Sequence, residues 1–169
     1  MKNFKFLRYT VFALLIMVNI GCDQISKSIV RDRLEYHEQI QLAGEHLLLT
    51  KVENSGAFLS IGDDFSPWAK NVLLNALPAI MMLGLLFWLF QGRMELGMAL
   101  GICCVIGGGI GNIFDRMTYG SVTDFLYIHV GFFRTGVFNF ADVSITSGAL
   151  FIIARGIWKP IPDKPGNSI

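Results

Sequence analysis

The sequence predicts an all-α integral membrane protein built from four transmembrane helices, with a small β-structure outside the membrane. Hydrophobic residues make up 53% of the 169 residues, and charged residues make up only 16%. Soluble domains carry about 25% charged residues, so this composition argues against a soluble enzyme. The mean hydropathy of +0.51 and four long apolar stretches point in the same direction. With 14 basic and 13 acidic residues, the net charge of +1 argues against nucleic acid as a partner.

Two of the apolar stretches, 72–90 and 96–114, are each 19 residues long and free of charge. A helix rises about 1.5 Å per residue, so each stretch can cross a hydrocarbon core about 30 Å thick. The stretch 137–158 is of similar length and is interrupted by Asp142 near its start. We therefore expect one membrane-embedded domain, residues 1–169, with spans at about 7–25, 71–90, 96–114 and 137–158.

The first apolar stretch is open to two interpretations. It has only 14 uncharged residues between Arg8 and Asp23, and it ends in a cysteine like that of a lipoprotein signal peptide. On that interpretation the chain is cleaved before Cys22. In the alternative, Arg8 extends its charge to one interface, Asp23 lies at the other, and the segment spans the membrane. We favour the span, because it places Asp23 on the same side as the other polar residues described below.

Basic residues close to the helix ends predict the orientation. With an inside N-terminus, the short basic segments at both ends and between the second and third spans lie in the cytoplasm, so both termini are cytoplasmic. The segments 26–70 and 115–136 then lie outside. Within them, 39–42 and 47–52 predict a small sheet on the outer membrane surface, and the aromatic stretch 129–135 predicts a short interfacial piece.

Polar residues at membrane depth are costly, so each one is a functional hypothesis. In the four-span topology, the polar residues at the outer helix ends and in the outer segments all fall on one side of the membrane. They are Asp23, Asn54, Asn112, Asp115, Arg116, Asp124, Asn139 and Asp142. This convergence predicts a polar site at the outer ends of the helices.

Two of these carboxylates suit a specific chemistry. Asp124 is expected in the loop after the third span, and Asp142 lies on the fourth. Two carboxylates held close together share a proton near neutral pH, so one can act as general base on a water while the other donates to a carbonyl oxygen. Arg116 shares a helix face with Asn112 and can bind a substrate carbonyl or steady a carboxylate. Spacing alone does not select peptide hydrolysis over other uses of paired acids.

Five short motifs follow one another along the chain. They are Asp23-Gln24-Ile25-Ser26-Lys27, Asn54-Ser55-Gly56-Ala57, Gly111-Asn112-Ile113-Phe114-Asp115-Arg116, Val122-Thr123-Asp124-Phe125 and Phe138-Asn139-Phe140-Ala141-Asp142. In this order and within four spans, they resemble the bacterial lipoprotein signal peptidases, also called signal peptidase II. The resemblance covers roughly residues 7–158, nearly the whole chain.

The resemblance implies an intramembrane aspartic endopeptidase of the bacterial inner membrane, with its site near the outer face. Such an enzyme removes signal peptides from diacylglyceryl-modified prolipoproteins and cuts just before the lipidated cysteine. Asp124 and Asp142 match the catalytic pair. The residues matching positions for substrate binding or support are Asp23, Lys27, Asn54, Gly56, Asn112, Asp115, Arg116, Asn139 and Ala141. We expect no metal or other cofactor, prolipoprotein substrates and membrane lipid as partners, and a monomer.

The family fold that the resemblance implies has four transmembrane helices, a small β-cradle and a short interfacial helix. This agrees with the segments inferred above. One departure is Phe58, where many members carry a second alanine after Gly-Ala. That difference concerns the edge of the cradle and leaves the chemistry unchanged.

Simpler interpretations stand beside this one. Asp115, Asp124 and Asp142 could hold Mg²⁺ for phospholipid-headgroup chemistry, since hard cations prefer carboxylate oxygens. Asp142 could form a structural ion pair with Arg116, and Lys27 could be an interfacial lysine whose ammonium reaches the headgroups. The chain could also be a membrane protein without enzymatic activity, or a lipoprotein.

The third span carries regularly spaced glycines. They form two small-xxx-small pairs, at 97 and 101 and at 107 and 111. In so apolar a segment this pattern predicts close helix packing rather than phosphate binding.

Overall fold

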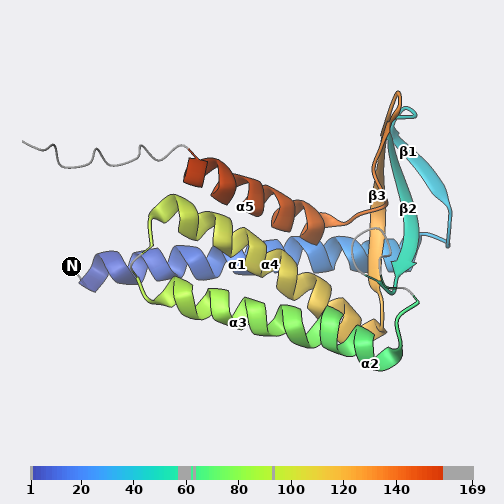
Figure 1. The fold of residues 1–169 in the computed structure, drawn as a ribbon. Coiled ribbons are helices and arrows are strands. Elements are labelled where there is room, and N and C mark those ends of the chain that lie inside the picture. The colour runs from blue at the N-terminus through green and yellow to red at the C-terminus, as the bar shows by residue number, and fades with distance from the viewer. Residues whose placement is uncertain (1, 57–61, 63, 93, 158–169) are drawn as a thin grey trace, which may run out of the picture.

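Four helices that are long and apolar enough to cross a membrane form the body of the computed structural model (Figure 1). They comprise Lys5–Arg33, Pro67–Phe90, Leu96–Tyr119 and Phe140–Ile157. The structure describes residues 2–56, 62, 64–92 and 94–157. The chain is a multi-pass membrane protein, and the four predicted spans are confirmed. The departure at Phe58 lies outside the described residues.

Local capping residues set the helix boundaries. The helices are α1 (Lys2–Arg33), α2 (Pro67–Lys70), η2 (Asn71–Ala76), α3 (Leu77–Phe90), α4 (Leu96–Tyr119) and α5 (Phe140–Ile157). The α2 helix, the π-helical turn η2 and α3 follow one another as the second span. Ser66 caps its start by accepting a hydrogen bond from the backbone N–H of Ala69 at 3.3 Å. Gly120 follows α4 with a left-handed φ of 80°, a common way for a helix to end.

The α1 helix is longer than predicted. It does not end near residue 25 but continues to Arg33, so that Asp23, Lys27 and Arg31 lie on one helix. Charged side chains at this depth need partners. Those partners, described below, allow the helix to continue past its apolar part.

The other spans differ from the predicted bounds by a few residues. The second begins at Pro67 rather than 71, and α4 continues to Tyr119 rather than ending at 114. The α5 helix begins at Phe140 rather than 137. Phe138 is held in an extended segment instead, because its backbone N–H donates to the carbonyl of Leu126 at 2.9 Å.

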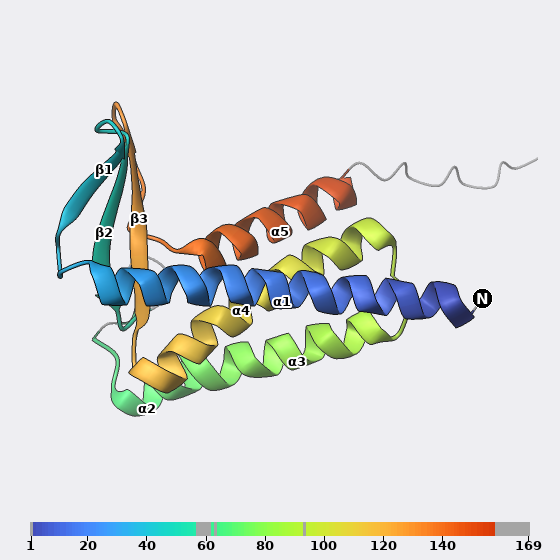
Figure 2. The ribbon, with the colours of Figure 1, turned by 180° about the vertical axis from the view of Figure 1, so that it is seen from behind.

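A four-stranded antiparallel sheet lies across one end of the helices (Figures 1 and 2). Its strands, in spatial order, are β1 (Gln39–Ala43), β2 (Leu47–Asn54), β3 (Val122–Val130) and β4 (Phe133–Arg134). The start of α1 and the end of α5 lie at the opposite end of the bundle (Figures 1 and 2). The strands predicted at 39–42 and 47–52 are confirmed as β1 and β2.

The β3 strand is an element that the sequence analysis did not predict. It pairs with β2 from Asn54 opposite Val122 onward, and Asp124 lies opposite Val52. Its β-branched and aromatic residues suit a strand. The expectation that Asp124 lies in a loop is therefore wrong: the residue sits on a strand in the middle of the sheet.

The stretch 129–135 forms a β-hairpin rather than the short interfacial helix that we expected around it. Val130 pairs with Phe133 across a two-residue turn. Gly131 takes a positive φ of 60° in this turn, which a residue without a side chain adopts easily. The glycine and the strand-forming residues on both sides favour the hairpin.

The α4 helix packs closely against both α1 and α5. A side chain at Gly97 or Gly101 would meet α5, and one at Gly107 or Gly111 would meet α1. The predicted role of these glycines in close packing is confirmed. The apolar core around α4 consists of Phe12, Leu89, Met94, Ala99, Ile102, Cys103 and Ile106. Because α1 supplies Phe12, the first apolar stretch is a wall of this bundle, as the span interpretation expects.

Candidate active site

Asp124 is a buried carboxylate on β3, with 3% of its surface exposed. It accepts a hydrogen bond from Nδ2 of Asn54 at 3.0 Å and another from Nδ2 of Asn139 at 2.6 Å. Burial raises the pKa of Asp124 to about 6; the charge of Asp142 also raises it, whereas the two hydrogen bonds lower it. A carboxyl group with this pKa can hold or release a proton near neutral pH.

Asp142 lies in the first turn of α5, and Asn139 caps that helix. Oδ1 of Asn139 accepts the backbone N–H of Asp142 at 3.0 Å, and the Asp142 carboxylate accepts the backbone N–H of Asn139 at 3.2 Å. This reciprocal pair has the geometry of a capping box. Nδ2 of Asn112 donates a further hydrogen bond to Asp142 at 2.9 Å. The direction of the Asp142 carboxylate is thus set by two elements, α4 and the start of α5.

Asn139 connects the two carboxylates. Its side-chain nitrogen donates to Asp124, and its backbone N–H donates to Asp142. The side chain is fully buried and also donates to Oδ1 of Asn112 at 3.2 Å. Five of the residues predicted for the site, from four elements and one connecting segment, therefore form one hydrogen-bonded group.

A buried ion network supports this group from α1. Lys27 is fully buried, and its ammonium lies 2.8 Å from the Asp23 carboxylate and 3.1 Å from that of Asp115. Arg31 forms a second ion pair with Asp115 at 2.8 Å. Lys27 also donates to Oδ1 of Asn112 at 2.9 Å. The interpretation of Lys27 as a lysine that reaches the headgroups is wrong, because its charge is neutralised inside the bundle.

Asp23 ties the ion network to α5. Its Oδ1 accepts the backbone N–H of Ala141 at 2.9 Å, next to Asp142 in the chain. Gly111 leaves the space that the Asp23 carboxylate occupies, since a Cβ there would meet that carboxylate. Asp23 and Ala141 thus lie beside the carboxylate pair and support it. Neither residue is among those that line the two cavities described below.

Arg116 reaches from α4 to the turn after β2. Its Nη2 donates to the carbonyl of Gly56 at 2.9 Å, and the backbone N–H of Gly56 donates to Oδ1 of Asn54 at 3.0 Å. Nε of Arg116 is buried with no hydrogen-bond partner among the described residues. No ion pair joins Arg116 to Asp142 within the described part of the chain, so the simple ion-pair interpretation finds no support.

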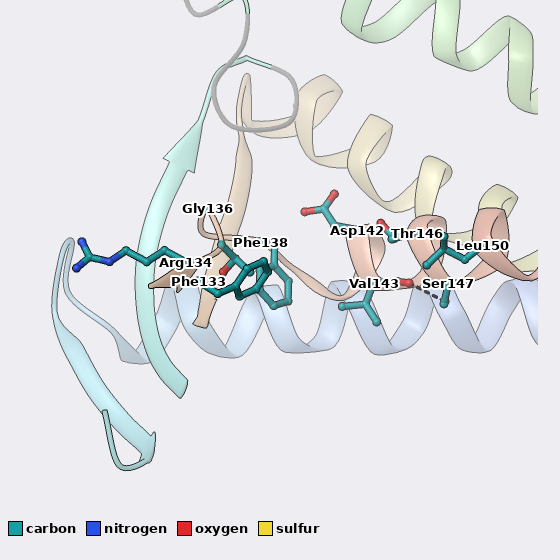
Figure 3. Close-up of a pocket in the computed structure, with 10 residues that line it drawn as sticks. Phe133, Arg134, Gly136, Phe138, Asp142, Val143, Thr146, Ser147 and Leu150 are labelled. Atoms are coloured by element: carbon teal, nitrogen blue, oxygen red, sulfur yellow. Dashed lines mark hydrogen bonds between the residues drawn. The ribbon is translucent and has the colours of Figure 1, made fainter. Parts of the chain in front are cut away.

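Two cavities reach Asp142 from different sides. One, of about 670 Å³, lies between the β3–β4 hairpin and α5 and is lined by Phe133, Phe138 and Leu150 among others. Figure 3 shows that the guanidinium of Arg134, at its rim, points away from Asp142. The other, of about 490 Å³, is lined by Leu73, Leu74, Pro78, Asn112, Arg116, Asp142, Ile145 and Thr146. Each cavity is mostly apolar and opens next to a carboxylate.

Four polar residues of this region were missed by the sequence analysis. Gln24 donates to the carboxylates of Asp23 and Asp115 at 3.1 and 3.0 Å. Nε of Arg31 donates to the Thr123 hydroxyl at 2.8 Å, and that hydroxyl donates to Glu53 at 2.8 Å. The helical spacing of Asp23, Lys27 and Arg31 was the available clue, since residues four apart share one face.

The three carboxylates of the magnesium alternative do not converge. Asp115 faces Lys27 and Arg31, whereas Asp124 and Asp142 face the three asparagines. Among the described residues, no three His, Cys, Asp or Glu side chains are grouped as metal ligands would be.

Comparison with known proteins agrees with this geometry. The family model described as signal peptidase (SPase) II matches residues 15–158. A lipoprotein signal peptidase of Desulforapulum autotrophicum is 30% identical over 89% of this chain and 93% of that protein. One of Pseudomonas fluorescens is 33% identical over 89% of this chain and 88% of its own length.

Two solved structures, each of a bacterial membrane enzyme, have the same fold. Their TM-scores are 0.81 and 0.79, at 23% and 22% sequence identity. The first alignment covers 95% of both chains, and the second covers 89% of this chain and 95% of the other. The match of the family model, together with curated relatives at 30% identity or more, shows that this chain belongs to the signal peptidase II family.

Proposed function

We propose that this protein is an intramembrane aspartic endopeptidase that removes signal peptides from diacylglyceryl-modified prolipoproteins and cuts just before the lipidated cysteine. Membership of the signal peptidase II family supports a peptidase acting on lipoprotein precursors. One observation carries the aspartic mechanism: Asp124 and Asp142, from two different elements, are both hydrogen-bonded to Asn139, and Asp142 lines two cavities.

The two carboxylates have different roles in hydrolysis, one as general base and the other as general acid. One takes a proton from a water molecule as the water oxygen adds to the carbonyl carbon of the scissile bond, and the other donates its proton to the carbonyl oxygen. When the tetrahedral intermediate collapses, a proton passes to the leaving amine. Asp124, with a pKa near 6, is suited to hold the shared proton.

Arg116 and the Asn54–Gly56 turn are proposed to bind the substrate backbone. The guanidinium donates from Nη2 to the Gly56 carbonyl, and Arg116 lines the same cavity as Asp142. A planar guanidinium suits a peptide carbonyl. The Asn54 side chain connects Asp124 to the turn, since it donates to Asp124 and accepts from the Gly56 N–H.

The position of the site suits a lipid-anchored substrate. Asp124 lies on β3 and Asp142 in the first turn of α5, at the end of the bundle opposite the start of α1 and the end of α5 (Figure 1). With cytoplasmic termini, this end faces the outer leaflet of the bacterial inner membrane, where a diacylglyceryl cysteine is anchored. The signal peptide helix can lie against the apolar spans, and the polar group keeps water at the scissile bond.

The test is cleavage of a synthetic prolipoprotein segment by the purified full-length protein, with the products identified by mass spectrometry. Its matched control is the same peptide with an unmodified cysteine. We expect a single cut just before the diacylglyceryl cysteine and no cut in the control. Cleavage elsewhere, or equal cleavage of the unmodified peptide, would contradict the proposed substrate class.

A further inference from the structure

The Asn112 side chain has three polar contacts that fix which way its amide points. Its oxygen accepts from the Lys27 ammonium at 2.9 Å and from Nδ2 of Asn139 at 3.2 Å, and its nitrogen donates to Asp142 at 2.9 Å. A lysine ammonium only donates hydrogen bonds. The atom of Asn112 that faces Lys27 must therefore be the oxygen, which leaves the N–H₂ group for Asp142.

We propose that Lys27 is a positioning residue that fixes the Asn112 amide with its N–H₂ group toward Asp142, and thereby holds the Asp142 carboxylate in place for catalysis. If the amide flipped, its N–H₂ group would face an ammonium and its oxygen would face a carboxylate, so both contacts would be repulsive. The inference deepens the proposed function and rests on it, because it assumes that Asp124 and Asp142 act as a pair.

The ammonium of Lys27 is well suited to this role because ion pairs hold it on two sides. It is fully buried between Asp23 and Asp115, one on its own helix and one on α4. Its three donors can be used by those two carboxylates and Asn112. A fixed cation beside an amide oxygen is a stronger restraint than a neutral donor, since hydrogen bonds to charged groups are about twice as strong.

Other charged groups also act on Asp142, and all of them are retained in the Lys27 variant. Asp124 on β3 disfavours a second negative charge, whereas the guanidinium of Arg116 on α4, which donates to Gly56, attracts Asp142 directly. Arg134 on β4 points away from Asp142 (Figure 3). On α1, Asp23 is neutralised by Lys27, and on α4 Asp115 is neutralised by Lys27 and Arg31. The amide of Asn112 is thus the contact through which Lys27 reaches Asp142.

The charge of Lys27 also acts on Asp124 through space. That effect predicts a different result from loss of the fixed Asn112 orientation. Through-space loss of the cation would make Asp124 harder to ionise and would not depend on Asn112. Loss of the fixed Asn112 orientation would weaken the hydrogen bond from Asn112 to Asp142. This effect can occur only when Asn112 is present. A double-mutant cycle separates the two effects.

The experiment compares full-length wild type with Lys27→Met, Asn112→Leu and the double variant, in detergent. Infrared spectra at one fixed pH follow the position of the Asp142 carboxylate band, which is identified by its loss in Asp142→Asn, so the readout does not require activity. Cleavage of the diacylglyceryl peptide is measured alongside it. Lys51→Met is the matched control, because Lys51 is also buried but donates to the Arg31 and Leu34 carbonyls at the end of α1.

We expect Lys27→Met to shift the position of the Asp142 band, because the hydrogen bond from Asn112 is weakened, and to lower kcat about 10- to 100-fold, the value of one hydrogen bond to a charged group. The double variant should be no worse than Asn112→Leu alone, and Lys51→Met should leave the position of the band unchanged. A full additional shift in the Asn112→Leu background, or an equal shift in Lys51→Met, would overturn the inference.

Two provisions keep the result interpretable. If Lys27→Met does not fold, the charge-balanced double variant Asp23→Asn/Lys27→Met takes its place with the same expectation. Activity that survives in Asp142→Asn or Asp124→Asn would instead refute the proposed function, and the position of the infrared band would still report whether Lys27 acts through Asn112.

Discussion

Asn139 and Asp142 hold each other at the start of α5 through two hydrogen bonds of 3.0 and 3.2 Å, one in each direction. The contacts that begin this helix are therefore the contacts that aim one of the proposed catalytic carboxylates. Stability and catalysis are therefore expected to be coupled at Asn139, which makes both sets of contacts.

Asn139→Ala should lower both stability and activity. Loss of the helix cap alone lowers the free energy of unfolding by roughly 1 kcal/mol. Asp124 also loses the hydrogen bond from the Asn139 side chain, and Asp142 loses the contact that orients it. We expect a lower unfolding temperature and a fall in kcat of at least about tenfold, from the value of a hydrogen bond to a charged group. Asn75→Ala is the control, since that half-buried side chain donates to Asn71 within the second span. An active, fully stable Asn139→Ala protein would contradict the coupling.

Asp124→Asn should stabilise the folded protein at neutral pH while it abolishes cleavage. The pKa of Asp124 is about 6 in the folded state and 3.8 in a free chain, so the folded state binds this proton more tightly. That contribution to stability is complete below pH 3.8 and is lost as the pH rises through about 6. The difference between the two pKa values corresponds to roughly 3 kcal/mol at most in the free energy of unfolding.

The measurement is thermal unfolding of wild type and Asp124→Asn at several pH values between 4 and 7. The gap between the two proteins should widen in favour of the variant as the pH rises. Asp32→Asn, which changes an exposed carboxylate near the end of α1, should run parallel to wild type. Parallel curves for Asp124→Asn would show that Asp124 is not held in a protonated form.

Catalysis should have a bell-shaped pH profile, because the pair works with one shared proton. In the free enzyme, kcat/KM should fall as the pH rises through the pKa of Asp124 near 6. Bound substrate excludes water and favours the neutral carboxyl, so the descending limb of kcat should lie at higher pH. Steady-state kinetics from pH 4 to 9 test this, and a rate that rises monotonically would count against a shared proton.

Gly108→Ala should lower activity by displacing α5. A Cβ at Gly108 would meet the carbonyl of Ala141, next to Asp142, so the start of the helix must move. Gly84→Ala is the matched control, since nothing lies within 4 Å of a Cβ there. We expect the control to be fully active and the Gly108 variant to be less stable and less active. Equal activity would show that the position of α5 tolerates such a shift.

Much of the architecture could be predicted from the sequence, because span length and apolar composition are local properties. The spans, β1 and β2 follow from such patterns, and the ordered motifs predict which polar residues gather. The β3 strand was missed because Asp124 and the long apolar run before it favoured a loop after a helix. The interfacial helix predicted around 129–135 is wrong, because Gly131 allows a two-residue turn between strand-forming residues.

The partners of the buried charges could not be predicted from the sequence. Lys27 has the length and position of a lysine at a membrane interface, and only the packing of α1 against α4 shows that Asp115 and Asn112 surround it. Arg31 and Thr123 lie far apart in the chain, so their contact depends on the folded sheet. Long-range pairing of this kind is set by tertiary structure rather than by any local pattern.

The central claim is that Asp124 and Asp142 perform the hydrolysis without a metal. The most direct test is cleavage of a diacylglyceryl prolipoprotein by wild type, Asp124→Asn and Asp142→Asn, each shown to be folded, with and without EDTA. We predict that wild type cleaves equally in EDTA and that both variants are inactive. Near wild-type activity in either variant would contradict the pairing, and loss of wild-type activity in EDTA would favour the magnesium alternative.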